Sequence, residues 1–293
     1  MDRIVIAGCG AVGASIAYHL ALKGARDVTL ADRAEIASGA TGKAMGGVRQ
    51  QFSTEAEVRL ARESVRFFQE LGRPLFEQVG YLFVATTDDG AERLRERMAA
   101  QRELGVPVED VDPSRVEGLY VEDVAAAGAC WEDGVAEPAE ITRELVRRAT
   151  AGGVEVRERT DAREVETDVL VVAAGASSPE LWPQLPIRPL CRQLVDDWRA
   201  RLAHRYPPAA GTPVHRAWAG LYDMTPDAHP IIGWVGDGVY AACGFSGHGF
   251  MQSPAVGRAV AEELIHGESE LDLSPYRLDR FSGEAVFPET LVL

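Results

Sequence analysis

The first 32 residues place two short apolar runs on either side of a glycine-rich turn and a longer apolar stretch. Residues 3–7 and 27–31 predict buried strands, because short apolar runs bounded by polar residues and glycine are typical of strands covered on both faces. Residues 14–23 between them predict a helix. A strand, a helix and a second strand in this order predict a parallel βαβ unit.

Later segments continue this mixture of helices and strands. Apolar residues recur at helical spacing over residues 54–71, which predicts a helix whose apolar stripe packs in the core. Further strands are predicted over 79–86, 154–158, 168–176 and 188–195, and a charged surface helix over 89–104. The pattern therefore indicates an α/β protein, built as one large domain or as two interleaved smaller ones.

A second glycine-rich stretch, ACGFSGHGFMQSP at residues 242–254, precedes the last helical pattern. Three of its glycines, at positions 244, 247 and 249, surround His248. Such glycines allow a positive φ or let a large group approach the backbone closely, and the stretch alone leaves both readings open. Ser253 is expected to cap the helix, and Pro254 to be its first residue.

Composition and charge exclude several classes of partner. The formal charge of -15 over 293 residues argues against nucleic acid and against an anionic membrane surface. The four cysteines show no CxxC spacing, so neither a metal site nor a disulfide framework is expected and a cytoplasmic location is predicted. Residues 4–17 are apolar, but only Arg3 precedes them and no convincing signal-peptide cleavage site follows. No stretch approaches the roughly 20 apolar residues that span a bilayer, so we expect a soluble protein.

The motif GxGxxG lies at the turn of the predicted βαβ unit. Gly8 permits the tight turn, Gly10 lets a pyrophosphate approach, and Gly13 allows close packing of helix and strand. Asp32 ends the second strand, where it is placed to accept hydrogen bonds from an adenosine ribose. An acid there disfavours a 2′-phosphate, so the motif predicts FAD or NAD rather than NADP. The alternative is a glycine-rich turn in an unrelated α/β fold.

The next segment, IASGATGKAMGGVRQQF at residues 36–52, distinguishes between FAD and NAD as the predicted cofactor. It replaces the crossover of an ordinary NAD domain with small residues and glycines followed by Arg49. Such a segment suits backbone packed against a flat ring system, which favours FAD. A flexible surface loop is the alternative.

Several stretches together resemble the D-amino-acid-oxidase-like superfamily of FAD enzymes, which includes glycine oxidase, sarcosine oxidase and the β subunit of dye-linked L-proline dehydrogenase. They are GCGAVG (8–13), SGATGKAMGGVRQQF (38–52), VGYLFVAT (79–86), EDGVAEPAEITRELVRRA (132–149), DVLVVAAGA (168–176), WAGLYDMTPDAHPIIG (218–233) and AACGFSGHGFMQSPAVG (241–257). The closest likeness is to the proline dehydrogenase and sarcosine oxidase branches, through GGVRQQF and GFSGHGF.

The resemblance implies a glutathione-reductase-like, Rossmann-type FAD-binding domain interleaved with a smaller, incomplete α+β substrate domain. The FAD-binding domain is expected to comprise residues 1–73, 140–185 and 218–275, the substrate domain residues 74–139 and 186–217, and a tail residues 276–293. The flavin is expected to be non-covalent, because Gly220 stands where sarcosine oxidase attaches its flavin through cysteine. The cofactor-binding residues implied are Gly8, Gly10, Ala11, Val12, Gly13, Asp32, Arg33, Ser38, Gly39, Ala40, Thr41, Ala44, Met45, Gly46, Ala174, Gly175, Gly220, Gly244, Gly247, His248, Gly249, Phe250 and Met251.

The same resemblance implies oxidation of the C–N bond of a small amino acid or N-substituted glycine, with hydride transfer to flavin N5 and with oxygen or another electron acceptor. Arg49 is expected to bind the substrate carboxylate as a guanidinium fork, and the alternative is a surface arginine of the following helix. Tyr222 is expected to line the reactive face of the flavin. His248 is expected either to stabilise the reduced flavin or to pack. His229 is expected between the loop at 225–233 and solvent.

Two pieces of the family pattern are missing: a hairpin after the strand at 154–158, and several dozen residues between Val195 and His204. We therefore expect only two convincing strands in the substrate domain, and we hypothesise that residues are missing near 158–166 and 194–200. Two further functions stay open. One is a flavin-holding subunit of a larger complex, or a degenerate scaffold, without turnover of its own. The other is a nicotinamide dehydrogenase that uses the N-terminal motif alone.

Overall fold

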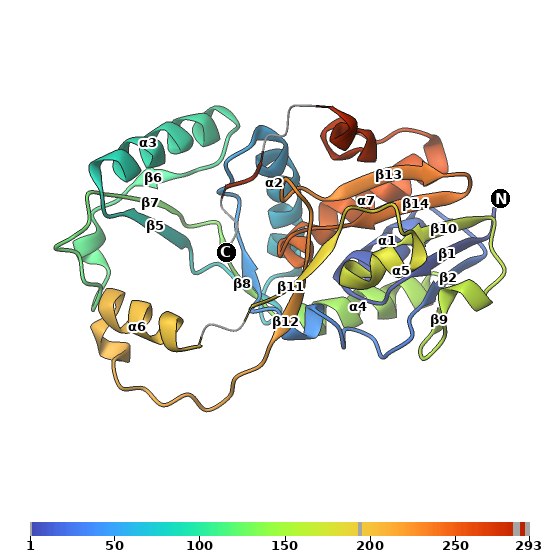
Figure 1. Ribbon diagram of the computed structural model, residues 1–293, viewed down its shortest axis with the longest axis horizontal. Helices are drawn as coiled ribbons and strands as arrows, with labels where there is room; N and C mark the ends of the chain where they lie inside the picture. The colour runs from blue at the N-terminus through green and yellow to red at the C-terminus, as the bar shows by residue number, and fades with distance from the viewer. Residues whose placement is uncertain (1, 193–194, 284–287, 291–293) are drawn as a thin grey trace.

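The larger lobe of the molecule is organised around one mostly parallel sheet. The computed structural model describes residues 2–192, 195–283 and 288–290. Within them, the strand order of this sheet is β13 (Ile231–Gly236), β14 (Val239–Cys243), β10 (Val169–Val172), β1 (Ile4–Ala7), β2 (Val28–Ala31) and β9 (Glu155–Arg157). β14, β10, β1, β2 and β9 run parallel, and β13 pairs antiparallel with β14 at the edge. The predicted α/β, Rossmann-type fold is confirmed (Figure 1).

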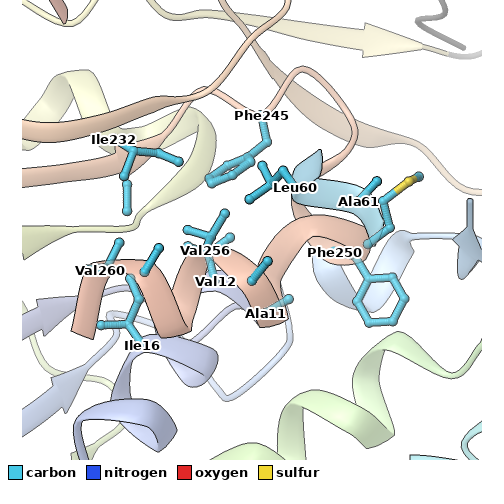
Figure 2. Close-up of a cluster of buried hydrophobic side chains, with 14 of the residues drawn as sticks. Ala11, Val12, Ile16, Leu60, Ala61, Ile232, Phe245, Phe250, Val256 and Val260 are labelled. Carbon is cyan, nitrogen blue, oxygen red and sulfur yellow. The ribbon is translucent and has the colours of Figure 1, made fainter. Parts of the chain in front are cut away.

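Four helices bury most of their apolar residues beside this sheet. α1 (Ala11–Leu22) packs against both α4 (Pro138–Ala151) and α7 (Gly249–His266), and α7 also packs on α2 (Glu55–Leu71). Figure 2 shows Ile16 of α1 and Val256 and Val260 of α7 meeting in this core. The other face of the sheet is covered by shorter segments, among them α5 (Ser178–Leu181) and η3 (Ala162–Glu164).

The last helix begins earlier than its sequence predicts. α7 starts at Gly249 with His248 as its N-cap, so Ser253 as the cap and Pro254 as the first residue are wrong. Pro254 lacks an N–H, and Ser253 Oγ donates instead to the carbonyl of Phe250, 2.8 Å away. Ser64 of α2 accepts from Ala255 N at 3.2 Å and donates to the carbonyl of Gln252 at 3.1 Å. Side chains thus replace the missing backbone hydrogen bond, and the helix continues through the proline.

The smaller lobe holds more strands than expected. β5 (Tyr81–Ala85), β7 (Ala126–Cys130) and β6 (Glu109–Asp110) form one antiparallel sheet, covered by α3 (Asp88–Glu103). β3 (Gly47–Val48), β8 (Gly134–Ala136) and β4 (Phe76–Glu77) form another. The expectation of only two strands here is therefore wrong. The small residues of β7 lack the β-branched signal of a strand, and their pairing with β5 decides their structure.

A two-stranded ribbon leads from the larger lobe toward α6 (Val195–Arg205). It consists of β11 (Arg188–Arg192) and β12 (Gly220–Met224), paired antiparallel over five residues each. Arg205 of α6 forms hydrogen bonds to the carboxylate of Asp123 and to the carbonyl of Tyr120, which tie α6 to the smaller lobe. Short 3-10 turns are η1 (Thr41–Lys43), η2 (Pro113–Arg115), η4 (Gly175–Ser177), η5 (Pro207–Ala209), η6 (Ser274–Tyr276) and η7 (Leu278–Ser282).

The hypothesis that residues are missing at two places stays a prediction, and at the first place the chain is bound to the residues that follow β2. Arg159 N and Thr160 N donate to the carbonyls of Ala34 and Asp32, and η3 follows directly. At the second place, residues 193–194 lie outside the described residues. The proposed domain boundaries stay a prediction.

Within the described part of the chain, none of the helices has the length and apolar character that crossing a membrane requires. The cellular compartment stays a prediction.

Candidate flavin site

The glycine-rich turn at residues 8–13 is shaped by backbone packed against backbone. Gly8 has φ +121, and a Cβ there would lie 2.4 Å from the carbonyl oxygen of Ala173. A Cβ at Gly13 would lie 1.9 Å from the carbonyl oxygen of Gly8, so α1 contacts the turn directly. Gly10 is the N-cap of α1 and provides no side-chain cap. Ala11 N, at the start of α1, donates to Thr41 Oγ1 at 3.0 Å, and the N-terminus of a helix favours an anion.

Asp32 lies at the end of β2 as predicted and binds the same turn. Its Oδ2 accepts from Cys9 N at 2.7 Å, and its Oδ1 accepts from Ala34 N at 2.7 Å. A carboxylate has about four acceptor positions, so these bonds leave capacity for ribose hydroxyls. Arg33, next in the chain, pairs with Glu180 at 2.8 Å on the surface.

The small-residue segment after β2 leads from this turn to the smaller lobe. Residues 38–40 and 42–45 are exposed, and Met45 is 81% exposed. Gly46 has φ +80, and its Cβ would lie 2.0 Å from the carbonyl oxygen of Ala136, so two backbones cross there. Trp218 Nε1 donates to the carbonyl of Lys43 at 2.9 Å, which places the segment beside the start of β12. The segment is therefore held in place rather than a free loop.

Arg49 and His248 meet in the interior between the two lobes. Arg49 is 1% exposed, so the alternative of a surface arginine is excluded. Its Nη2 lies 3.4 Å from His248 Nε2, and its guanidinium lies 4.1 Å from the centre of the Phe52 ring. The Phe52 ring also meets the His248 ring edge to face at 5.0 Å. Burial lowers the pKa of Arg49, and the charge of Glu289 opposes that shift more than any other group.

Tyr222 joins this cluster through the glycine stretch before α7. A Cβ at Gly247, which has φ +99, would lie 3.0 Å from the Tyr222 ring. Gly244 has φ +76, and its N donates to Asp223 Oδ2 at 2.8 Å. Gly244 and Gly247 are therefore needed for two reasons. Both have a positive φ, and Gly247 lets the Tyr222 ring approach the backbone closely. The structure brings Arg49, Tyr222 and His248 together at the start of α7.

His229 is buried, and the expectation that it faces solvent is wrong. It is 7% exposed, and its Nδ1 lies 3.0 Å from Glu57 Oε1 on α2. The second carboxylate oxygen of Glu57 accepts a hydrogen bond from Gln252 Nε2 on α7. The resemblance gave no sign of this pairing, because the buried carboxylate that binds His229 comes from a distant helix.

Asp133 is a site residue that sequence reasoning missed. It is fully buried in the turn between β7 and β8 and accepts from Gln50 N at 2.9 Å and from Gln51 Nε2 at 3.2 Å. It therefore fixes the two residues that follow Arg49. Burial raises its pKa from 3.8 to about 6, against the hydrogen bonds that lower it. The signal in the sequence was only one acidic residue before a glycine.

We expect Asp133 to give the stability of the protein a pH dependence. The folded state holds the proton of this carboxyl more tightly than the unfolded state does, so its contribution to stability is complete below about pH 4 and is lost as pH rises through about 6. The loss is about 3 kcal/mol, from about two pKa units. Urea unfolding of the wild type and of Asp133→Asn between pH 4 and pH 8 measures it. The advantage of the wild type over the variant should shrink across this range, and parallel curves would contradict the assignment.

Comparisons with known proteins agree with this geometry. The family model described as "DAO: FAD dependent oxidoreductase" matches residues 3–196 and 191–263. The FAD-dependent oxidoreductase domain-containing protein 1 of Xenopus laevis is 25% identical over 410 residues, covering 95% of this chain and 82% of that protein. Glycine oxidase of Geobacillus kaustophilus is 24% identical over 370 residues, covering 96% of this chain and 97% of that protein. The crystal structure of L-proline dehydrogenase from P. horikoshii is similar with a TM-score of 0.88 and 26% identity, over 96% of this chain and 98% of that one.

These matches confirm FAD as the cofactor and confirm the predicted class of enzyme, an FAD-dependent amine or amino-acid oxidase or dehydrogenase, at the level of the family. They also show that this chain is shorter than its relatives in internal segments. The aligned lengths of 410 and 370 residues exceed the 293 residues of the chain. The two ranges matched by the family model meet at residues 191–196, beside the place where a long segment was expected to be absent.

Proposed function

The chain belongs to the DAO family of FAD-dependent oxidoreductases, and from that membership we propose that it oxidises the C–N bond of a small amino acid or N-substituted glycine. The observation that carries the proposal is the buried pair of Arg49 and His248 at the start of α7. The Phe52 ring and the carbonyl of Gln51 orient this guanidinium, and a guanidinium can bind a carboxylate at two points.

FAD, when bound, supplies the acceptor for the hydride that leaves the substrate carbon. In our proposal, the glycine turn at 8–13 and the N-terminus of α1 hold the pyrophosphate, and Asp32 holds the adenosine ribose. The flat ring system would lie against the small residues between Ser38 and Gly46, where nothing lies within 4 Å of the Cβ position of Gly39. The fit rests on the close backbone contacts at Gly8 and Gly13 and on the absence of a side-chain cap at Gly10.

The residues of the chain would then position the substrate. Arg49 would bind the carboxylate through a guanidinium already oriented by the Phe52 ring and by a hydrogen bond to the carbonyl of Gln51. Tyr222, whose ring lies against Gly247, would line the substrate side. The N-terminus of α7 and His248 would stabilise negative charge that develops beside them. Oxygen or another acceptor would then reoxidise the cofactor.

Anaerobic titration of the FAD-loaded protein tests this function. Sarcosine, glycine or proline should bleach the absorbance band at about 450 nm that oxidised flavin shows. Bleaching by one of these and not by a matched compound without a carboxylate would support the oxidation. It would also support the carboxylate clamp, by which we mean binding of the substrate carboxylate by Arg49. A flavin that dithionite reduces but no amino acid or N-substituted glycine reduces would overturn the proposal.

The second candidate is a flavin-holding subunit without turnover of its own. It is favoured by the internal shortening of the chain and by the ribbon of β11 and β12, where Leu190 and Leu221 are 39% and 47% exposed. A site without a full cover admits water, which weakens electrostatic stabilisation of the reacting groups. The same titration separates the two candidates, because a scaffold binds FAD and leaves it oxidised.

A further inference from the structure

A short segment near the end of the chain is built into the site. Residues 288–290 lie between the lobe that carries α3 and the lobe that carries the parallel sheet, at the dark red end of the chain (Figure 1). Glu289 is 3% exposed, and its N donates to the carbonyl of Asp227 at 3.0 Å. Asp227 is itself buried and pairs with Arg280 at 2.7 Å. The segment is thus anchored to the loop that also holds His229.

The carboxylate of Glu289 binds the turn that leads into α2. Ser53 N donates to both of its oxygens, at 3.1 and 3.0 Å, and Ser53 Oγ donates to Oε1 at 2.7 Å. Thr54, the N-cap of α2, donates its N–H to Oε2 at 3.3 Å, and Thr290 N donates back to Ser53 Oγ at 3.1 Å. These bonds join positions more than 230 residues apart in the chain. A carboxylate there is favoured by the N-terminus of the helix.

This turn directly follows the residues of the clamp. Ser53 is preceded by Phe52, whose ring contacts both the guanidinium of Arg49 and the ring of His248. The carbonyl of Phe52 accepts from Gln101 Nε2 at 2.8 Å. The segment between Arg49 and Thr54 is therefore held at one end by Asp133, through Gln50 and Gln51, and at the other end by Glu289.

We propose that Glu289 is a positioning residue of the substrate site, which fixes the turn at residues 52–54 and supplies a resident negative charge that tempers the affinity of Arg49 for carboxylates. A buried guanidinium without such a counter-charge would hold any small anion tightly and would release a carboxylate product slowly. The part that concerns carboxylate affinity rests on the proposed role of Arg49. The part that concerns the buried charge does not.

Two variants of the FAD-loaded protein compare the loss of the Glu289 charge with the loss of one hydrogen bond that anchors the turn at residues 52–54. Glu289→Gln removes the charge and leaves one acceptor oxygen where the carboxylate has two, whereas Ser53→Ala removes one hydroxyl and keeps the charge. Acetate is the probe, and its dissociation constant is measured from the change that it causes in the flavin spectrum. Glu289→Gln should bind acetate about 3- to 10-fold more tightly, because one negative charge that repels acetate is removed. Ser53→Ala should melt at a lower temperature and should not gain the tighter acetate binding expected of Glu289→Gln, because the charge of Glu289 remains.

The reduction potential of the flavin gives an independent readout. Removal of a buried negative charge should raise the potential in Glu289→Gln, because reduced flavin is anionic. Glu103→Gln, an equal change of charge at an exposed position on α3, serves as the control and should change neither quantity. If acetate leaves the wild-type spectrum unchanged, the carboxylate clamp fails, and the potential alone decides the role of Glu289.

A Glu289→Gln variant that matches Glu103→Gln in both acetate affinity and potential would overturn the proposal and leave Glu289 as a helix cap. Should Glu289→Gln not fold, Glu289→Asp keeps the charge and draws it back from the turn. It is then expected to lower the melting temperature and to keep acetate affinity within about twofold of the wild type. A Glu289→Asp variant that loses stability as expected but changes its affinity for acetate by much more than twofold would contradict the proposal.

Discussion

Replacing Arg49 by lysine is expected to lower kcat/KM by about 30- to 1000-fold, which corresponds to about 2–4 kcal/mol of lost transition-state stabilisation. The guanidinium carbon lies over the Phe52 ring at 4.1 Å from its centre, and Nη2 lies 3.4 Å from His248 Nε2. An ammonium ion cannot reproduce a planar fork that stacks on an aromatic ring and binds a carboxylate at two points. Steady-state kinetics with the amino acid that bleaches the flavin measure the change.

Arg62→Lys is the matched control for this prediction. Arg62 lies on α2 and donates to the carbonyl of Leu104 away from the cluster, so its replacement tests a general effect of losing one guanidinium. We expect kcat/KM of Arg62→Lys to stay close to that of the wild type. Full activity in Arg49→Lys, with flavin content and melting temperature unchanged, would rule out the clamp.

Gly13→Ala is expected to abolish stable binding of FAD. The added Cβ would lie 1.9 Å from the carbonyl oxygen of Gly8, so α1 would have to move away from β1 and from the phosphate-binding turn. Overpacking of this kind costs about 1–3 kcal/mol of stability, and the stabilisation that bound FAD gives to the folded state would be lost in addition. The measurements are flavin absorbance after gel filtration and thermal melting with and without added FAD.

Gly24→Ala provides the control at the other end of α1. Gly24 has φ +74, and nothing lies within 4 Å of its Cβ position, so alanine there is strained but meets no neighbour. We expect a loss of about 1–2 kcal/mol in stability and an unchanged flavin content. A Gly13→Ala protein that retains FAD as Gly24→Ala does would show that the close contact between α1 and the turn is not required for the cofactor.

The sequence by itself determined the features that depend on neighbouring residues. The βαβ unit, its glycine-rich turn and the acid at its second strand lie within 32 residues, and the dinucleotide-binding motif requires glycine and a carboxylate at fixed spacing. The helices α2 and α3 were predicted to within a residue or two, α2 from its apolar period and α3 from its charges at i,i+4 spacing, and both patterns are local. The motifs in family order also identified FAD.

Only the tertiary structure decided how distant segments meet. β7 forms because small residues find a partner in β5, and α7 passes Pro254 because Ser64 of another helix helps to replace the missing hydrogen bond. Buried polar groups need partners, and sequence gives no sign of which distant residue provides one. Thus Glu57 binds His229 in the interior. Asp133 and Glu289 bind the two ends of the segment that carries Arg49. All of these hydrogen bonds join positions more than 80 residues apart.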